Sequence, residues 1–513
     1  SETFVSGACP APSRRVIFVV RLYFLSQPRT IKNMSEVKFV DTTLRDGQAS
    51  LWAENMRTGM MLAVAERLDN AGFQAIEIIA SSHIKKCVRE LREDPFERMR
   101  LIARKITKTP LRAIGAERIS AFELSPNAIV DLWFERMVAN GMKQLRISDP
   151  ANDPAGWTKS VARAKKVGLT TIVNQIYSVS PKHTDEYYGR KAREAAALKP
   201  DIICLKDPGG LLVPERTKAL VEVIKKNAPA IPIELHVHCT TGLGPLCALE
   251  AIKLGVGLID TSVPPLANAS SNPSVFNVAQ NAQSLGYSPL VDLETLAPVE
   301  KELTFIARRE NLPIGEPVEY DYSQYVHQVP GGMISNLRFQ LKNIGMLDRL
   351  DKVLEEAVRV RADLGYPIMV TPFSQFVGSQ AAINVIKGER YAQVTDQVIQ
   401  YATGLWGEEA ASEVEPNIKD KILTRPRAKE FAGWQPPQPS LEEMRSKLGG
   451  PSLGDDELLM RYVAGNEDVD AMRAAGAPKA YSDTRNPLLT LVQELSQQKD
   501  CRQIYVQKDG LTL

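Results

Sequence analysis

The chain has 513 residues, of which 44% are hydrophobic, 24% charged and 6% aromatic, a composition typical of a globular protein with a large core. Its 63 basic and 61 acidic residues leave a net charge of +2, and no long basic run with interleaved aromatic residues occurs, which argues against a nucleic-acid-binding surface. The six cysteines lack metal-ligand spacing and several lie in apolar runs, so we expect reduced thiols in a cytoplasmic protein.

Residues 1–33 differ from the rest of the chain. Their apolar stretch, 16–25, is interrupted by Arg21 and is too short to span a membrane. A basic region before an apolar stretch is also the pattern of a targeting peptide. We expect a poorly structured leader over 1–33, with the functional chain starting near Met34 and containing no membrane span.

From Val37 onward, β-branched runs alternate with amphipathic segments. The strand-like runs are Val37–Leu44, Ala75–Ala80, Leu111–Ala116, Gln144–Ser148, Thr170–Tyr177, Ile202–Lys206, Ile233–Cys239 and Leu258–Val263. The helical segments between them include Arg57–Ala71, Pro126–Asn140, Ala155–Val167, Thr184–Leu198, Glu215–Asn227 and Pro245–Leu254. This α/β alternation predicts a (β/α)8 TIM barrel over 34–298, near the usual length of about 250 residues. An open doubly wound sheet is the alternative, disfavoured because no Gly-x-Gly-x-x-Gly turn follows the first strand.

Beyond the barrel, helical patterns dominate. They predict a largely helical C-terminal domain over 299–480, with helices such as Met346–Leu364 and Asp455–Ala464. The tail, 481–513, contains a helical segment, Asn486–Gln498, and a strand-like end, Arg502–Gln507. We expect the tail either to dock a partner or to lie idle on the barrel.

Two of the five histidines, His236 and His238, lie two residues apart in the seventh predicted strand. Alternate residues of a strand share a face, so both imidazoles can reach one metal ion. Taken alone, the pair fits a buried hydrogen-bonded pair equally well.

Polar residues at the ends of other strands favour the metal. Asp46 and Arg45 follow the first strand, and Lys206 ends the sixth. The carboxyl ends of barrel strands meet at one mouth, where Asp46 would join the imidazoles in a ligand mixture suited to Zn²⁺, Mn²⁺ or Co²⁺. Arg45 would be a fixed cation beside the metal. Singly, Asp46 could be a strand-end cap and Lys206 a surface ion pair, but their coincidence at strand ends favours a site.

Several motifs resemble one protein family. The segment Asp41–Gly47 (DTTLRDG) resembles the first-strand signature of metal-dependent barrels that include hydroxymethylglutaryl-CoA lyase, isopropylmalate synthase and the biotin-dependent carboxyltransferases. Further matches favour the carboxyltransferase subunits of transcarboxylase, oxaloacetate decarboxylase and pyruvate carboxylase. These segments are Glu93–Arg98, Ser178–Thr184, Leu205–Asp207, His327–Leu337 and Val370–Gly378, and the resemblance extends beyond Arg427.

The resemblance implies a metal held by Asp46, His236, His238 and a carbamylated Lys206. It also implies that Thr371 shuttles a proton between biotin and substrate, whereas Thr371 alone would suggest a turn hydroxyl before Pro372. Because no Ala-Met-Lys-Met-type biotinylation site and no evident ATP-binding half occur, the expected partners are a biotin carboxyl carrier protein and a biotin carboxylase subunit. A homodimer or higher oligomer is also expected.

The sequence departs from the family pattern at the substrate end. Gly115 stands where the family carries an arginine that grips the keto-acid carboxylate, Ala49 replaces a glutamine, and Phe373 replaces a small polar residue. Arg112 or Arg118 could substitute only if the strand end were rebuilt. The resemblance therefore implies a substrate site lined by Arg45, Gln48, Gly115 and Phe373, opened and less polar on one side.

The sequence thus predicts a biotin-dependent carboxyltransferase that moves CO2 between carboxybiotin on a partner and an enolisable carbonyl substrate. The substrate is expected to be a 2-oxo acid such as pyruvate or oxaloacetate, or a relative altered at the carboxylate end. A metal-dependent retro-aldol lyase or acyl-CoA condensing enzyme on the same barrel is the first alternative. A non-catalytic assembly subunit is the second.

Overall fold

The computed structural model describes residues 35–120, 124–329, 334, 337–338, 341–431 and 433–481, and the backbone of two short strands near the C-terminus. The chain divides into two compact units, Ser1–Ser35 and Glu36–Leu513. The expected leader, 1–33, and the expected helix Asn486–Gln498 lie outside the described residues. Of the tail, Tyr481 and the short strands β10 (Gln507–Lys508) and β11 (Leu511–Thr512) are described, and the two strands pair antiparallel.

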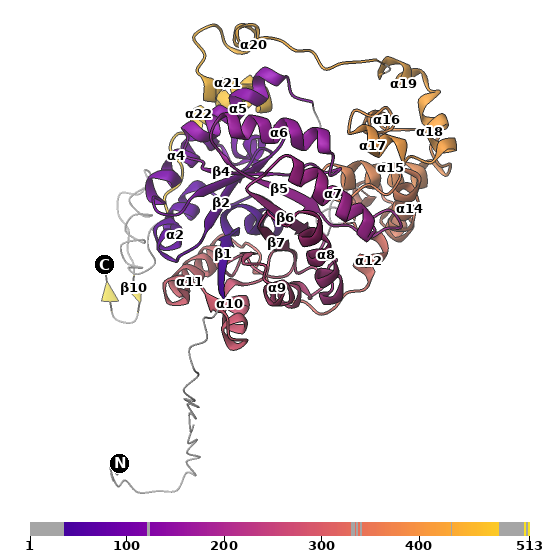
Figure 1. Cartoon of the computed structure of the whole chain (residues 1–513). Helices are drawn as coiled ribbons and strands as arrows, with labels where there is room; N and C mark the ends of the chain where they lie inside the picture. The colour runs from indigo at the N-terminus through magenta and orange to yellow at the C-terminus, as the bar shows by residue number, and fades with distance from the viewer. Residues whose placement is uncertain are drawn as a thin grey trace, which may run out of the picture. The chain divides into compact units, whose positions relative to one another are not determined.

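Eight parallel strands form a closed barrel, which confirms the predicted TIM-barrel fold (Figure 1). β1 pairs with both β8 and β2, which closes the ring, and a ninth short strand pairs with the start of β1. The strands are β1 (Glu36–Asp41), β2 (Ala75–Ala80), β3 (Leu111–Gly115), β4 (Gln144–Ile147), β5 (Thr170–Ile176), β6 (Ile202–Asp207), β7 (Ile233–Val237), β8 (Leu258–Thr261) and β9 (Ser288–Pro289).

Helices surround the barrel and begin where the sequence supplies starting residues. Asp94 accepts the backbone N–H groups of Phe96 and Glu97 at the start of α4, and Pro95 occupies its first turn. These helices are α1 (Gln48–Trp52), α2 (Thr58–Asn70), α3 (His83–Lys86), η2 (Cys87–Leu91), α4 (Pro95–Lys105), α5 (Asn127–Ala139), α6 (Pro154–Lys166), α7 (Asp185–Ala197), α8 (Pro214–Asn227), α9 (Gly244–Lys253), α10 (Val275–Ser284) and α11 (Leu293–Arg309).

A second apolar core follows the barrel. It extends from Val329 to Ala428 and is separate from the barrel core. The helices of this region, called the helical region below, are α12 (Ser323–His327), η3 (Leu347–Arg349), α14 (Leu350–Asp363), α15 (Phe373–Lys387), α16 (Asp396–Ala402), α17 (Glu408–Ser412), α18 (Pro416–Leu423) and α19 (Pro426–Phe431). The expected boundary at residue 298 falls inside α11, which packs against α2 of the barrel.

The last described helices return to the barrel. α20 (Leu441–Leu448), α21 (Asp455–Ala464) and α22 (Asn466–Ala475) contribute Met444, Leu459 and Met472 to the barrel core rather than to the helical region. α21 packs against α3 and α5, and Figure 1 shows this gold segment beside the purple α4 and α5. Residues 441–475 are therefore part of the barrel layer in space.

The first strand is shorter than the predicted Val37–Leu44. β1 ends at Asp41, and Thr43–Gly47 form a wide helical turn, η1. The backbone N–H groups of Arg45 and Gly47 both donate to the carbonyl of Thr42, which turns the chain away from the sheet. An extended strand would place consecutive residues on opposite faces, whereas this turn allows Arg45 and Asp46 to lie in contact.

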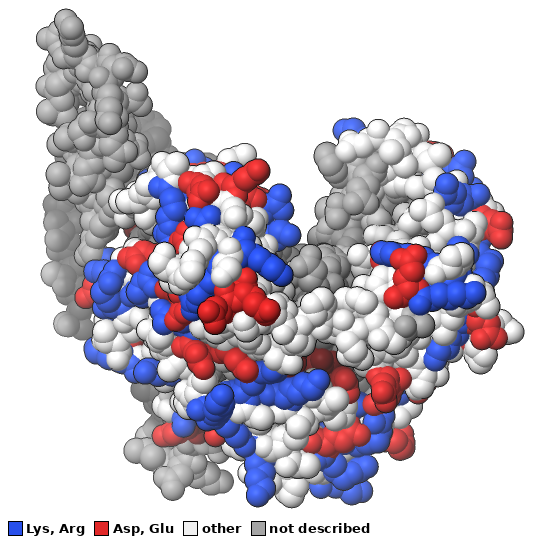
Figure 2. All heavy atoms as spheres, turned by 90° about the horizontal axis from the view of Figure 1, so that it is seen from above, with Lys and Arg blue, Asp and Glu red and all other residues white. Residues whose placement is uncertain are grey.

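The charged surface agrees with the near-neutral composition. On the face shown in Figure 2, acidic and basic side chains are interspersed rather than gathered by sign. Within the described part of the chain, no helix combines the length and the apolar character needed to cross a membrane.

Candidate active site

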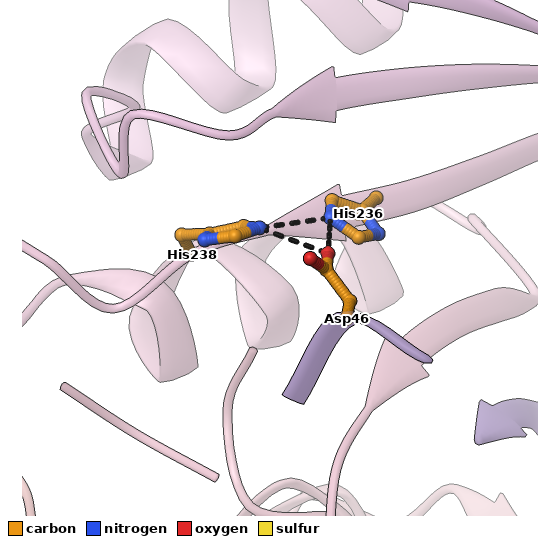
Figure 3. Close-up of side chains that lie close together, drawn as sticks. All are labelled: Asp46, His236 and His238. Atoms are coloured by element: carbon orange, nitrogen blue, oxygen red, sulfur yellow. Dashed lines mark hydrogen bonds and ion pairs between the residues drawn. The ribbon is translucent and has the colours of Figure 1, made fainter. Parts of the chain in front are cut away.

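Three side chains converge at the mouth of the barrel (Figure 3). The Nε2 atom of His236 lies 2.8 Å from Oδ2 of Asp46, and Nε2 of His238 lies 3.1 Å from the same oxygen. The two Nε2 atoms are 3.0 Å apart. One lone pair from each residue therefore faces one point, as three ligands of one metal ion do.

The outer nitrogens of both histidines are occupied. Nδ1 of His236 lies 2.6 Å from Oδ2 of Asp260, and Nδ1 of His238 lies 2.6 Å from the carbonyl oxygen of Ser270. An acceptor at Nδ1 fixes the proton there and leaves Nε2 free to coordinate. The ligand set therefore fits a divalent metal ion.

Burial, followed by the charge of Lys206, holds the pKa of His236 well below its usual range, so this imidazole is neutral.

Beneath the histidines, the barrel interior is filled with paired charges. Arg146 lies at the centre, where it ion-pairs with Glu77 at 3.1 Å, with Asp260 at 2.6 Å and with Glu234. Five strands each contribute one fully buried charged residue to this layer: Glu77, Arg112, Arg146, Glu234 and Asp260. These pairs fix the position of the strand that carries His236.

Lys206 lies next to the three ligands. It is on β6, in register with His236 of β7, so the two side chains leave neighbouring strands on the same face. Burial, then the charge of Arg45, lowers the pKa of Lys206 to about 8. None of the described carboxylates lies within ion-pair distance of its amine. Lys206 is thus a buried amine without a fixed partner beside the ligand set.

Arg45 connects the ligand set to the charged interior. Its guanidinium lies 3.0 Å from Oδ1 of Asp46 and also pairs with Glu77. Burial would raise the pKa of Asp46, but Arg45 and the two imidazoles hold it well below its usual range. Asp46 is therefore anionic, as a carboxylate ligand of a metal ion must be.

A cleft opens above the three ligands. Its volume is about 320 Å³, and His238, Ala49 and Thr371 are among the residues that line it. Thr371 precedes α15 of the helical region, so the cleft is built from the barrel and from the helices that come after it. One expected metal ligand, His238, and the expected proton-shuttling hydroxyl of Thr371 thus line one cleft.

The remaining expected substrate residues lie at different places. Gln48 is fully buried; its Oε1 accepts from the N–H of Met56 at 3.4 Å, and its Nε2 has no partner among the described groups. Phe373 is 1% exposed and packs against other aromatic rings of the helical region. Although Phe373 is close to Thr371 in the sequence, its ring lies inside the second core.

Gly115 ends β3 beside Ser81. A Cβ atom at this position would lie 3.6 Å from Ser81 Oγ and 3.8 Å from Trp133 Nε1, which is ordinary contact distance. A side chain would therefore fit there, and it would start toward the end of β2 and helix α5.

Neither arginine near Gly115 replaces the missing cation. Arg112 is fully buried and donates to both carboxylate oxygens of Glu234, at 2.7 and 3.1 Å. Arg118 lies 3.5 Å from the centre of the Trp406 ring and donates to the carbonyl of Leu405. Both guanidiniums are engaged away from the cleft.

Known proteins match both parts of this architecture. The HMGL-like family model matches residues 36–302, and the conserved carboxylase domain model matches residues 325–484. The chain is 37% identical to a pyruvate carboxylase subunit of Methanocaldococcus jannaschii over 391 residues, which cover 75% of this chain and 68% of that protein. It is 29% identical to the methylmalonyl-CoA carboxyltransferase 5S subunit of Propionibacterium freudenreichii subsp. shermanii, with 86% of each covered.

This chain belongs to the biotin-dependent carboxyltransferase family. Another relative in the family, the 2-oxoglutarate carboxylase large subunit of Hydrogenobacter thermophilus, is 31% identical, with 77% of this chain and 61% of that protein covered. The carboxyltransferase chain spans 66–68% of the length of two archaeal pyruvate carboxylase subunits.

Solved structures match the fold. The carboxyl transferase domain of Rhizobium etli pyruvate carboxylase superposes with a TM-score of 0.76 at 22% identity, covering 86% of this chain and 78% of that chain. The same domain with oxamate and biotin gives a TM-score of 0.78. At this identity the likeness concerns the fold alone.

Sequence reasoning missed the residues that orient the carboxyltransferase ligands. Asp260, Arg146 and the carbonyl of Ser270 were not singled out. The sequence did contain a sign of the first two, because each is the one charged residue of its predicted strand. The backbone carbonyl of Ser270 leaves no such sign.

Proposed function

We propose that this carboxyltransferase moves a carboxyl group between carboxybiotin on a partner protein and an enolisable carbonyl substrate bound in the cleft. The observation that carries the proposal is the meeting of two features at that cleft. His238, which converges with Asp46 and His236, lines the cleft, and Thr371 of the helical region lines the same space.

In this proposal Asp46, His236 and His238 hold a divalent metal ion such as Zn²⁺, Mn²⁺ or Co²⁺, with Lys206 as carbamate beside them. Carbamylation would convert a buried, unpaired amine into an anionic oxygen ligand. When bound, the metal would act as a Lewis acid toward a carbonyl oxygen. Asp260 and Ser270 keep the two imidazoles oriented, and Arg45 supplies a fixed positive charge near the reacting oxygen.

Thr371 is the proposed proton carrier. Its hydroxyl can accept a proton and donate one at the same oxygen. From its place in the lining of the same cleft as His238, it would pass a proton between the ureido nitrogen of biotin and the substrate carbon. The catalytic residues of the proposal are therefore Arg45, Lys206 and Thr371.

The partners are inferred from the same chemistry. We propose a biotin carboxyl carrier protein and a biotin carboxylase subunit as partners, in a cytoplasmic complex in which this chain is a homodimer or higher oligomer. The four buried free thiols, Cys87, Cys204, Cys239 and Cys247, support a reducing compartment. The names of two relatives give pyruvate and 2-oxoglutarate as the compounds carboxylated, and a third is named a methylmalonyl-CoA carboxyltransferase subunit.

A reaction run in the decarboxylating direction tests the proposal. The metal-loaded chain is mixed with a β-keto acid, with and without free biotin, and the CO2 that is released when the carboxybiotin product decomposes is measured. Biotin-dependent release that is lost in Thr371→Ala, with bound metal retained, supports carboxyl transfer. Lys206→Ala should lose both metal and activity. Release that does not depend on biotin and survives Thr371→Ala would favour the lyase alternative.

A further inference from the structure

The described lining of the cleft contains one carboxylate and no lysine or arginine. Among the described residues that line it, only His238 and Glu54 have titratable side chains, and none is lysine or arginine. His238 faces the other metal ligands through Nε2. Glu54 is therefore the one carboxylate of this lining, and it lies in the same cleft as Thr371.

Glu54 is held in place by its backbone. It follows α1, and both Ala53 and Glu54 have positive φ angles, 48° and 64°. The N–H of Glu54 donates to the carbonyl of Gln48 at 3.2 Å. Positive φ at two consecutive non-glycine residues is uncommon, and here it ends the helix so that residue 54 reaches the cleft rather than continuing along the helix.

The nearest partner of Glu54 is His83, another of the five histidines. Its Nε2 lies 3.5 Å from Oε1 of Glu54, and the imidazole is 3% exposed. Burial lowers the pKa of His83, so the ring is neutral at physiological pH and leaves the carboxylate charge in place. Arg98, the buried cation that interacts electrostatically with Glu54, is paired with Glu93 at 2.9 Å. Arg45 is likewise shared between Asp46 and Glu77.

We propose that the carboxyl acceptor of this enzyme is an uncharged enolisable ketone rather than a 2-oxo acid, and that Glu54 is the residue that rejects an acceptor carboxylate. The inference rests on the proposed carboxyltransferase function and adds the class of its substrate. A 2-oxo acid would bring a second negative charge into a cleft whose described lining offers no lysine or arginine to receive it. The proposed metal ion already has two anionic ligands, Asp46 and the carbamate of Lys206. Burying an unpaired charge beside a like charge is costly, and such repulsion is an effective source of specificity.

Two β-keto acids that differ at one group make the test. Oxaloacetate and acetoacetate share the carboxyl group that leaves, but oxaloacetate carries a carboxylate where acetoacetate carries a methyl group. In each reaction the bond between the carboxyl carbon and the adjacent carbon breaks, a bond from that carboxyl carbon to the biotin nitrogen forms, and the proton of that nitrogen goes to the substrate carbon. The products are carboxybiotin with pyruvate or with acetone.

The expected result with the metal-loaded chain and free biotin is a kcat/KM for acetoacetate at least about tenfold above that for oxaloacetate, the scale of one unpaired like-charge contact. Glu54→Gln removes the charge with little change of shape, so the preference should fall about tenfold. A matched control, Glu66→Gln, removes an exposed carboxylate on α2 and should keep the wild-type preference. Ala49→Lys adds a cation to the same cleft and should shift the preference in the direction of Glu54→Gln.

A wild-type preference for oxaloacetate, or an unchanged preference in Glu54→Gln and Ala49→Lys, overturns the inference while leaving carboxyl transfer intact. The absence of any biotin-dependent CO2 release from either acid instead counts against the proposed function. Saturation-transfer NMR then tests the cleft directly with pyruvate and its uncharged isostere pyruvamide. If the wild-type chain binds pyruvamide more tightly than pyruvate, and Glu54→Gln shifts the ratio of the two affinities toward pyruvate, the inference is supported. Tighter binding of pyruvate by the wild-type chain overturns it.

Discussion

The imidazole of His236 contacts two groups of opposite charge through one nitrogen. Nδ1 lies 2.8 Å from a guanidinium nitrogen of Arg146 and 2.6 Å from Oδ2 of Asp260. Arginine can only donate a hydrogen bond, whereas a carboxylate can only accept one. The proton on Nδ1 that coordination through Nε2 requires is therefore satisfied by Asp260 alone, and Arg146 neutralises that carboxylate.

Substitution Asp260→Asn should weaken metal binding. The amide loses the charge that holds the Nδ1 proton and leaves Arg146 with fewer carboxylate partners, so we expect metal affinity to fall about 10–100-fold. Competition with a chromogenic chelator measures the affinity directly. Asp348→Asn, an exposed position on η3, is the control and should bind metal like the wild type. Wild-type affinity in Asp260→Asn would contradict the role given to Asp260.

Asp41 should make the stability of the metal-free protein depend on pH. Burial raises the pKa of Asp41 to about 7 from the ordinary value of 3.8. Between these values the folded chain holds a proton that the unfolded chain releases, so this group makes stability fall as pH rises from about 4 to 7. The asparagine of Asp41→Asn cannot ionise. The free energy of unfolding of the variant, relative to that of the wild type, should therefore rise by a few kcal/mol across this range and then stay constant.

Urea unfolding of both metal-free proteins at pH 5 and pH 8 measures the Asp41 effect. The difference in free energy of unfolding between variant and wild type should be larger at pH 8. An equal difference at the two pH values would show that Asp41 has an ordinary pKa in the folded protein.

At the scale of elements, one carboxylate of α21 bridges two helices of the barrel. Asp456 accepts from Arg100 of α4 at 2.6 Å and from Arg136 of α5 at 2.7 Å. Its side chain is 18% exposed, so the two ion pairs are only partly screened by solvent. This residue connects helices that are more than 300 positions apart in the sequence.

Removing this contact should loosen the last helices without unfolding the barrel. We expect Asp456→Ala to lower the free energy of local opening of α20–α22 by about 1–2 kcal/mol, the value of two partly buried charge-assisted hydrogen bonds. Amide hydrogen exchange of α21 measures it. Asp470→Ala, whose exposed carboxylate pairs only within α21 and α22 among the described residues, is the control. Equal exchange in the two variants would contradict the expectation.

The sequence predicted the strands better than the segments after them. All eight predicted strands occur, because runs of β-branched residues bounded by turn residues depend on local preference. The end of the first strand was misplaced, since the hydrogen bonds of Thr42 to Thr261 and Asn272, which divert the chain there, join residues more than 200 positions apart. Helices α4 and α10 were missed despite an Asp–Pro start in α4.

In the site, too, features that follow from a general rule could be predicted, whereas contacts between distant residues could not. Asp46, His236 and His238 were predicted as neighbours because barrel strands end at one mouth, a rule of the fold that needs no coordinates. Glu54 and His83 could not be paired from the sequence, since their approach depends on two residues with positive φ after α1. The packing of residues 441–475 against the barrel could not be predicted from the sequence either, because the helical pattern of this segment resembles that of the preceding helices.

At the scale of the whole molecule, Arg361 joins the helical region to the barrel. It lies on α14, and its guanidinium donates to Ser178 Oγ at 2.9 Å and to the carbonyl of Val179 at 3.0 Å, both in the loop after β5. Gln328 donates to the same carbonyl at 2.7 Å. These bonds set the position of Thr371 relative to the metal ligands.

Arg361→Leu should therefore impair transfer more than metal binding. Displacing a catalytic group by about 1 Å can cost on the order of 100-fold in rate, so we expect biotin-dependent CO2 release to fall about 10–100-fold. Metal content, measured by atomic emission on the same preparation, should be unchanged. Arg359→Leu, on the same helix with a side chain that is 67% exposed, should keep both properties. Parallel loss of metal and activity in Arg361→Leu would contradict the expectation that Arg361 affects carboxyl transfer and not metal binding.

The return of α20–α22 to the barrel also has a consequence for synthesis on the ribosome. These helices cover the surface formed by α3 and α5, yet about 300 residues separate α5 from α20. At a synthesis rate of roughly 5–20 residues per second, that surface stays exposed for on the order of 15–60 s before the helices that cover it are made. During this interval the nascent barrel presents apolar side chains to chaperones and to neighbouring chains. A chain shortened to end before residue 440 would present them permanently.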